Sequence, residues 1–219
     1  MKNMENKGSP DIRETLEKRS GARTAERRSK YSRTTKETNI RLDLNLDGEG
    51  SYDIRTGIGF FDHMLTAIAV HGAMDLLLEA DGDLEVDGHH TVEDCGIVFG
   101  QALREALGDK AGIARYGSML LPMDGSLAQV ALDISGRPYL KFDADFQGGR
   151  TGDFDTDLLA EFFRALAFAA GITLHIRLLE GDNDHHSCEA ICKAFAHALK
   201  TAVRCDGQAQ VLSSKGVLE

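Results

Sequence analysis

The chain has 219 residues, of which 42% are hydrophobic and 27% are charged, a composition typical of a globular protein with a substantial core. The net charge is −10, but residues 1–36 carry 11 Lys/Arg against 5 Asp/Glu, so the remainder carries −16. This acidic body argues against nucleic acid as a partner. No apolar run approaches the roughly 20 residues that span a bilayer, and residues 1–10 lack the apolar segment of a secretory signal. We therefore expect no membrane role.

Residues 1–27 are polar and basic and show no apolar periodicity. Such a segment cannot bury enough apolar surface to hold a fixed fold. We predict a flexible N-terminal extension, with at most a transient helix around residues 12–19. Its charge would suit an anionic partner, although a solvated tail explains the composition equally simply.

Residues 35–110 form the first of two similar halves. Ile40, Leu42 and Leu44 alternate with polar residues, which is the period of a half-buried strand, and Asp47 and Gly48 begin a turn. The predicted elements are strands over 40–46 and 51–56, a helix over 60–71, a strand over 74–80 and a helix over 90–107.

The second half, over residues 111–219, repeats this order. Alternating apolar residues predict its strands, and Gly171 is suited to a left-handed helix C-cap. The predicted elements are strands over 128–134 and 140–146, a helix over 156–170, a strand over 172–178 and a helix over 185–203. Each half thus follows a β-β-α-β-α order.

The two halves also share a motif. His89-His90-Thr91-Val92-Glu93 in the first half corresponds to His185-His186-Ser187-Cys188-Glu189 in the second, at an offset of 96 residues. We interpret this as an internal duplication. It predicts an α+β fold, a sandwich of sheets and helices built from two half-domains, rather than a dinucleotide-binding sheet.

The repeated motif has the spacing of metal ligands. His89 and Glu93 are four residues apart at a helix start, so both project from one face and can bind one ion, as can His185 and Glu189. The second histidine of each motif is turned about 100° away. A pseudo-twofold axis then suggests two equivalent sites in a crossed arrangement, in which His90 and His186 each complete the site of the other half.

A single motif would be weak support, because adjacent surface histidines are common, and polar helix starts are the simpler explanation for one copy. Two copies at matching positions favour a metal centre. Corresponding helices nominate a fourth ligand for each site, His63 in the first half and Glu161 in the second. Imidazole and carboxylate ligands without thiolate suit Mn²⁺, Fe²⁺, Co²⁺ or Zn²⁺, and octahedral Mn²⁺ best.

Four cations are candidates for binding phosphate. Lys193 lies four residues after Glu189, on the metal-facing side of its helix. Lys215 follows Ser213 and Ser214 in a short loop suited to an anion, and Arg115 and Arg137 offer planar guanidinium groups. Each alone is more simply a solvated surface residue. His71 lies near His63 on the same helix and could border the pocket, whereas His175 and His197 are more simply structural.

The four cysteines indicate the compartment. Cys95, Cys188, Cys192 and Cys205 show no CxxC spacing, which favours small apolar side chains in a reduced, cytoplasmic protein.

From about Arg28 onward the sequence resembles imidazoleglycerol-phosphate dehydratases. The matching stretches are SRTTKET (32–38), GIGFFDHML (57–65), DGHHTVED (87–94), DISGRP (133–138), DHHSCE (184–189) and SSKGVL (213–218). The resemblance implies a dehydratase domain over residues 28–219, two Mn²⁺ ions per site, and a homo-oligomer of trimers assembled into a 24-subunit particle. Its substrate would be a small phosphorylated imidazole.

The resemblance also implies residue roles. One ion would be held by His63, His90, His185 and Glu189, and the other by His89, Glu93, Glu161 and His186. Glu37 matches the acid/base residue. The expected substrate contacts are Glu37, His63, His71, Arg115, Arg137, Lys193, Ser213, Ser214 and Lys215.

Three features depart from the family pattern. Many members have His where this chain has Glu161, and usually Pro where it has Leu212. The N-terminal extension has no counterpart.

The implied function is a carbon–oxygen lyase of histidine biosynthesis. It would dehydrate imidazoleglycerol phosphate to imidazole-acetol phosphate through an imidazolate intermediate. Two alternatives use the same ligands, a dinuclear metallohydrolase of a small phosphate ester and a non-catalytic metal-binding cage. Product analysis separates the hydrolase from the dehydratase, since only the hydrolase releases inorganic phosphate. The cage predicts metal binding without turnover.

Overall fold

The computed structural model describes residues 27–205, 211–214 and 218. The predicted N-terminal extension, except Arg27, and Lys215 lie outside the described residues. Each half folds into a four-stranded sheet and two helices, which confirms the α+β class and the duplicated layout. No helix in the described part of the chain has the length and apolar character needed to cross a membrane.

In the first half, one helix lies between the third and fourth strands and the other follows the fourth strand. Its elements are β1 (Arg28–Thr34), β2 (Thr38–Asn45), β3 (Tyr52–Arg55), α2 (Gly59–Gly72), β4 (Asp75–Gly82) and α3 (His89–Leu107). The sheet order is β1-β2-β4-β3, with β3 and β4 parallel and the other pairs antiparallel.

The second half repeats this order with one added hairpin. Its elements are β5 (Tyr116–Met123), β6 (Ser126–Asp133), β7 (Tyr139–Asp143), β8 (Arg150–Thr151), β9 (Phe154–Asp155), α4 (Leu158–Ala170), β10 (Thr173–Glu180) and α5 (Asp184–Val203). Its sheet order, β5-β6-β10-β7, has the same pattern as the first sheet, including a parallel final pair. As predicted, Gly171 ends α4 in the left-handed conformation.

Each half has one strand more at its start than the sequence pattern predicted. β1 and β5 are edge strands, each paired with a single neighbour. In β1 only Ser29 is fully buried, and in β5 Gly117 and Leu121 are the buried residues, so neither strand shows the regular apolar alternation of a central strand. The half-domain order is therefore β-β-β-α-β-α.

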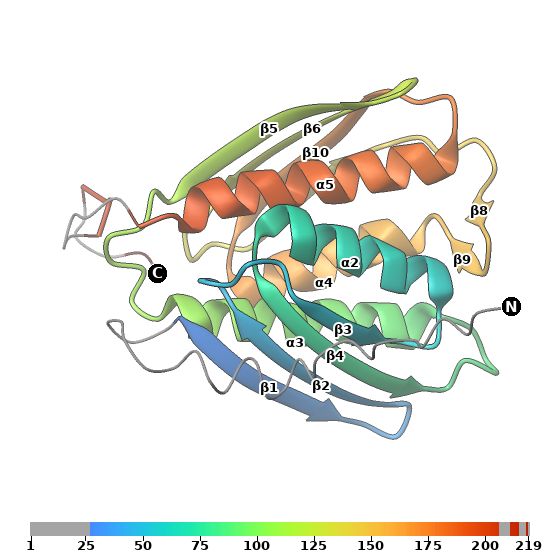
Figure 1. Ribbon diagram of the computed structural model, residues 1–219, viewed down its shortest axis with the longest axis horizontal. Helices are drawn as coiled ribbons and strands as arrows, with labels where there is room; N and C mark the ends of the chain where they lie inside the picture. Colours follow the sequence, from blue (N-terminus) through green and yellow to red (C-terminus); the bar gives the residue numbers. More distant parts are fainter. Residues whose placement is uncertain (1–26, 206–210, 215–217, 219) are drawn as a thin grey trace, which may run out of the picture.

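The four helices lie between the two sheets (Figure 1). The second helix of each half covers its own sheet: α3 packs on β1 and β2, and α5 on β5 and β6. The first helix of each half packs against the second helix of the other half, so α2 contacts α5 and α4 contacts α3. These two helix–helix contacts, α2 with α5 and α4 with α3, each bring side chains from the two halves together.

The contact between α3 and α4 is close because two glycines of α3 face α4. A Cβ atom added at Gly96 would lie 2.6 Å from the carbonyl oxygen of Phe162, and one at Gly100 would lie 2.5 Å from that of Leu166. Both distances are shorter than van der Waals contact, so only glycine allows the two backbones this approach.

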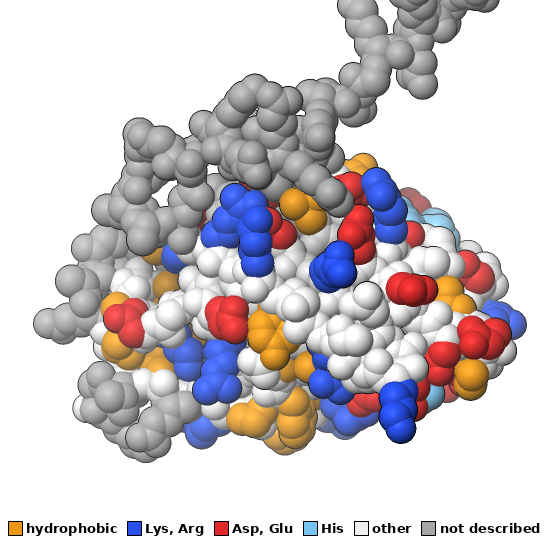
Figure 2. All heavy atoms as spheres, turned by 90° about the horizontal axis from the view of Figure 1, so that it is seen from below, with side chains coloured by type: hydrophobic (Ala, Val, Ile, Leu, Met, Phe, Trp, Pro, Cys, Tyr) orange, Lys and Arg blue, Asp and Glu red, His pale blue; other side chains and the backbone are white. Residues whose placement is uncertain are grey.

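The outer face of the first sheet carries basic and acidic side chains interspersed rather than a patch of one sign (Figure 2). Asp43 forms ion pairs with Arg28, at 2.6 Å, and with Lys30, at 3.2 Å. Arg55 forms an ion pair with Glu79 at 3.8 Å. These ion pairs offset part of the charge on this face.

Candidate metal centre

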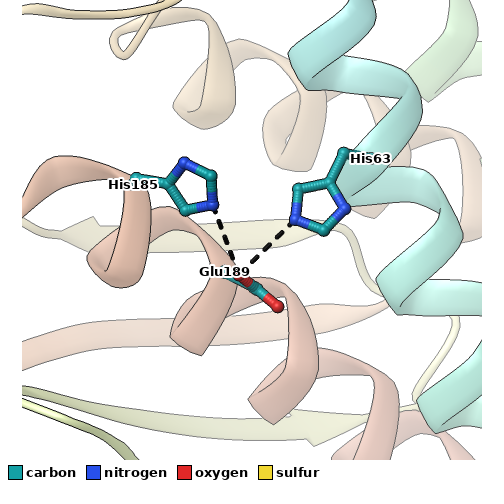
Figure 3. Close-up of side chains that lie close together, drawn as sticks. All are labelled: His63, His185 and Glu189. Carbon is teal, nitrogen blue, oxygen red and sulfur yellow. Dashed lines mark ion pairs between the residues drawn. The ribbon is translucent and has the colours of Figure 1, made fainter.

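Two imidazoles and a carboxylate converge where α2 meets the start of α5 (Figure 3). The Nε2 atoms of His63, on α2, and His185, on α5, each lie 3.5 Å from Oε2 of Glu189. One potential ligand atom from each residue lies within 4.8 Å of the others. His185 and Glu189 share a helix face because they are four residues apart, as predicted.

The start of α5 is fixed by Asn183. Its backbone is extended, as in an N-cap residue, and its side-chain oxygen accepts the backbone N–H of His186 at 3.1 Å. This cap satisfies a donor of the first turn and holds His185 at the helix start. The sequence pattern predicted the helix over 185–203 but not the capping role of Asn183.

Glu189 is a buried carboxylate held ionised by its neighbours. Burial raises its pKa, but the hydrogen bond and charge of Lys193 and the proximity of His63 outweigh burial, so the net pKa is lowered. The Lys193 ammonium lies 2.8 Å from Oε1, whereas both imidazoles face Oε2. An ionised carboxylate beside two imidazoles is a donor set that fits a divalent transition-metal ion.

The pseudo-symmetric position, where α4 meets the start of α3, holds three more of the predicted ligands, His89, Glu93 and Glu161. His89 Nε2 lies 3.9 Å from Glu93 Oε2, again from residues four apart. Arg164, also on α4, contacts both carboxylates: its Nε donates to Glu161 at 2.9 Å and its Nη2 to Glu93 at 3.3 Å. These carboxylates raise the pKa of Arg164, chiefly through the hydrogen bond that Arg164 donates to Glu161.

The second histidine of each motif has another neighbour within the chain. His90 Nδ1 lies 3.0 Å from Asp83, and His186 Nδ1 lies 3.6 Å from Asp124. Among the described residues, neither histidine joins the His63 group. The crossed assignment of these two histidines therefore stays a prediction.

Glu37, the predicted acid/base residue, lies in the turn between β1 and β2. Thr35 Oγ1 accepts the backbone N–H groups of Glu37 and Thr38, at 3.1 and 3.0 Å. Thr38 in turn donates to the carboxylate of Asp94, on α3. The hydrogen bond with Asp83 raises the pKa of His90, and the charge of Glu37 adds to this effect against the opposing effect of burial. The Glu37 carbonyl also accepts the backbone N–H of Asp83 at 3.1 Å, and Asp83 contacts His90, so Glu37 lies near His90.

Two of the predicted phosphate-binding cations are already engaged. Arg115 makes a bidentate ion pair with Asp133, at 2.7 and 3.0 Å, and donates to the carbonyl of Leu212 at 2.6 Å. Lys193 contacts Glu189, as described above. The contact with Leu212 brings the segment of Ser213 and Ser214 beside Arg115, and the phosphate-binding role of these residues stays a prediction.

Arg137 and His71 complete the predicted set. Arg137 is exposed, and within the described part of the chain its guanidinium has no hydrogen-bond or ion-pair partner. His71 faces His197 on α5, with Nδ1 and Nε2 3.3 Å apart. Burial, followed by the charge of Lys193, lowers the pKa of His71. Whether His71 borders a substrate stays a prediction.

The chain is similar to known proteins over the region that contains both repeated motifs. A family model for imidazoleglycerol-phosphate dehydratase matches residues 56–199. The chain belongs to the imidazoleglycerol-phosphate dehydratase family. The match confirms the resemblance and the prediction of an enzyme of this class.

Relatives of this family align over most of the chain. An imidazoleglycerol-phosphate dehydratase of Desulfitobacterium hafniense is 58% identical over 193 residues, covering 88% of this chain and 98% of the relative. One of Clostridium botulinum is 56% identical over 191 residues, covering 87% and 97%.

Solved structures of imidazoleglycerol-phosphate dehydratases share the fold. The Staphylococcus aureus structure has a TM-score of 0.72 at 45% identity, covering 81% of this chain and 99% of its own. The Pyrococcus furiosus structure, which is a complex with (S)-C348, has a TM-score of 0.75 at 39% identity, covering 85% and 99%.

Three residues near these groups were not predicted as part of the site. Arg164 lies three residues after Glu161, a spacing that favours an ion pair and could have been recognised in the sequence. Asp83, at the end of β4, and Asp124, in the β5–β6 turn, carry no such signal. Their contacts with His90 and His186 depend on the tertiary arrangement of the dehydratase fold.

Proposed function

We propose that this chain dehydrates imidazoleglycerol phosphate to imidazole-acetol phosphate in histidine biosynthesis, at a centre of two Mn²⁺ ions. The convergence of His63, His185 and Glu189 in a chain of this family is the observation that carries the proposal. An ionised carboxylate between two imidazoles, all on rigid helices, is suited to hold a divalent ion.

The proposed ligand sets are His63, His90, His185 and Glu189 for one ion, and His89, Glu93, Glu161 and His186 for the other. In one chain His90 contacts Asp83 instead of the His63 group. We infer that the second histidine comes from another copy of the chain, in a homo-oligomer of trimers that builds a 24-subunit particle. His90 and His186 are partly exposed, which leaves them accessible to a neighbouring copy.

When bound, the two cations supply Lewis-acid stabilisation of negative charge on the imidazole ring. The Glu37 carboxylate takes the proton from the carbon that bears the second hydroxyl. The C–O bond beside the ring breaks, and the departing hydroxide takes the proton from Glu37 and leaves as water. The resulting enol becomes the ketone. Arg137, Lys193 and the Ser213–Ser214–Lys215 loop hold the phosphate and so orient the reacting carbons.

A reducing compartment suits the cysteines. Cys95, Cys188 and Cys192 are buried free thiols. Burial raises their pKa values, that of Cys188 to about 12, so they remain protonated and unreactive. We place the enzyme in the cytoplasm on this basis.

The test uses purified, Mn²⁺-loaded protein and imidazoleglycerol phosphate. We expect a ketone that keeps its phosphate, with no inorganic phosphate released. Glu189→Gln preserves size but removes the charge, so it should lower metal content and abolish turnover, whereas Glu180→Gln, at an exposed strand end, should change neither. Release of inorganic phosphate would indicate a hydrolase instead, and metal binding without any turnover would indicate a cage.

A further inference from the structure

The two candidate metal groups differ in how their carboxylates are engaged. Around Glu189, the only ion-pairing lysine or arginine among the described residues is Lys193, which contacts Oε1 and leaves Oε2 facing His63 and His185. Around the other group, Arg164 binds Glu161 through Nε at 2.9 Å and Glu93 through Nη2 at 3.3 Å. One guanidinium therefore bridges both oxygen donors of that group.

The internal duplication shows that this bridge is specific to one half. The helices α2 and α4 correspond at an offset of 98 residues, which pairs His63 with Glu161 and their C-caps, Ala73 with Gly171. The same offset pairs Arg164 with Thr66. Since threonine carries no charge, the first group has no cation at the position from which Arg164 reaches the second.

A guanidinium and a divalent cation would compete for the same carboxylates. A planar guanidinium with several donors can hydrogen-bond to two carboxylates at once, and its single positive charge offsets part of their negative charge without a metal. An ion entering this group has to displace those hydrogen bonds and also approach a fixed positive charge. At Glu189, Lys193 contacts Oε1, so an ion at Oε2 displaces no hydrogen bond from a lysine or arginine in the region that the structure describes, although it still approaches the Lys193 charge.

We propose that Arg164 occupies the second metal group as a resident counter-ion and makes the two metal sites unequal. The site of His63, His185 and Glu189 fills first. The site of His89, Glu93 and Glu161 fills at a higher metal concentration, and only when Arg164 withdraws. This inference rests on the proposed two-metal function, and it concerns the order of loading rather than the existence of the sites.

The experiment titrates the metal-free, full-length protein with Mn²⁺ alone, followed by calorimetry and by the paramagnetic resonance of free Mn²⁺. Wild-type protein should show two classes of site in equal number. Arg164→Thr, which copies residue 66, should tighten the weaker class about tenfold, the size expected for losing two partly exposed ion pairs. The tighter class should not change.

Two further variants test whether the effect depends on the guanidinium of Arg164. Arg164→Lys keeps the charge but cannot span both carboxylates with one planar group, so the weaker class should tighten by a smaller factor. This variant also serves if the threonine variant does not fold. Arg177→Ala removes an exposed arginine that pairs with Asp143 at 3.3 Å on the second sheet, and should leave both classes unchanged.

Thermal unfolding separates direct contact from a general charge effect. If Arg164 is a resident counter-ion, Arg164→Thr lowers the melting temperature of the metal-free protein, and saturating Mn²⁺ reduces the difference from wild type. A single class of site in wild type, unchanged classes in both Arg164 variants, or an undiminished metal-free melting temperature would overturn the inference. Failure of every protein to bind Mn²⁺ would instead contradict the metal centre and the proposed function with it.

Discussion

The Asp153 carboxylate accepts the backbone N–H of Gly59 at 2.9 Å, so a side chain of the second half caps the helix of the first half that carries His63. The same carboxylate accepts the N–H of Phe60 at 3.3 Å. The N-cap residue of α2 itself, Ile58, has no side chain able to accept a hydrogen bond. The cap is therefore supplied from the β8–β9 hairpin.

Replacing Asp153 with alanine should destabilise the start of α2. We expect a loss of about 1 kcal/mol in the free energy of unfolding, as for other lost N-caps. Urea denaturation at pH 7 measures this loss. Asp153→Asn is the matched control, because its amide oxygen can still cap and should retain most of the stability.

The same contact predicts a pH dependence. The hydrogen bond from Gly59 is the main reason that the pKa of Asp153 is lowered. A group with a lowered folded-state pKa stabilises the fold at neutral pH, and this contribution is lost as the pH falls through that lowered value. The stability difference between wild type and Asp153→Ala should therefore shrink in acid. A constant difference down to pH 2 would contradict an ionic cap.

Gly96 should be essential for the second metal group. A methyl group at this position would lie 2.6 Å from the backbone oxygen of Phe162, so Gly96→Ala must push α3 away from α4. We expect a destabilisation of about 1–3 kcal/mol, typical of overpacking. Because Glu93 and Glu161 lie on these two helices, Mn²⁺ titration should show weakening of one site only. Equal weakening of both sites would show that the strain spreads through the core.

The sequence predicted those parts of the fold that have strong local signals. The helices predicted over 90–107 and 185–203 correspond to α3 and α5, and Gly171 marked the end of α4 correctly. The edge strands β1 and β5 lacked such a signal because their outward positions are solvated and their inward positions include Ser29 and Gly117.

The site was predictable where its residues are neighbours on one helix. The pairing of His185 with Glu189 follows from helical geometry alone. The repeat nominated His63 as a fourth ligand, the resemblance implied that it joins His185 and Glu189, and the three side chains lie together. The partner of His90 was not predictable, because its contact with Asp83 depends on how the β4–α3 connection folds back on α3. Periodicity describes single elements and does not specify such long-range contacts.

Asp94 should position the turn that carries Glu37. Its buried carboxylate accepts the Thr38 hydroxyl and, at 3.0 Å, the Nε of Arg33. Asp94→Ala leaves Thr38 buried without this acceptor, which typically costs about 1–3 kcal/mol. We expect a lower kcat at unchanged metal stoichiometry, because the proposed base loses its orientation while the ligands remain. Asp94→Asn keeps an acceptor and should recover part of the kcat. Loss of metal in either variant would show that Asp94 does more than position the turn that carries Glu37.

Arg137 provides the sharpest test of the phosphate assignment, because its backbone is fixed while its guanidinium remains exposed. Its N–H donates to Ser135 Oγ at 3.1 Å, and its carbonyl accepts the Thr173 hydroxyl at 3.1 Å. Arg137→Ala should therefore preserve the fold and both metal ions. Losing one charge-assisted contact to phosphate typically costs about 1.5–3 kcal/mol, which raises KM by about 10- to 150-fold. Arg41→Ala removes an exposed arginine from the first sheet and should leave KM unchanged. Steady-state kinetics together with metal analysis decide the assignment: a normal KM in Arg137→Ala, or a loss of metal, would show that this guanidinium does not hold the phosphate.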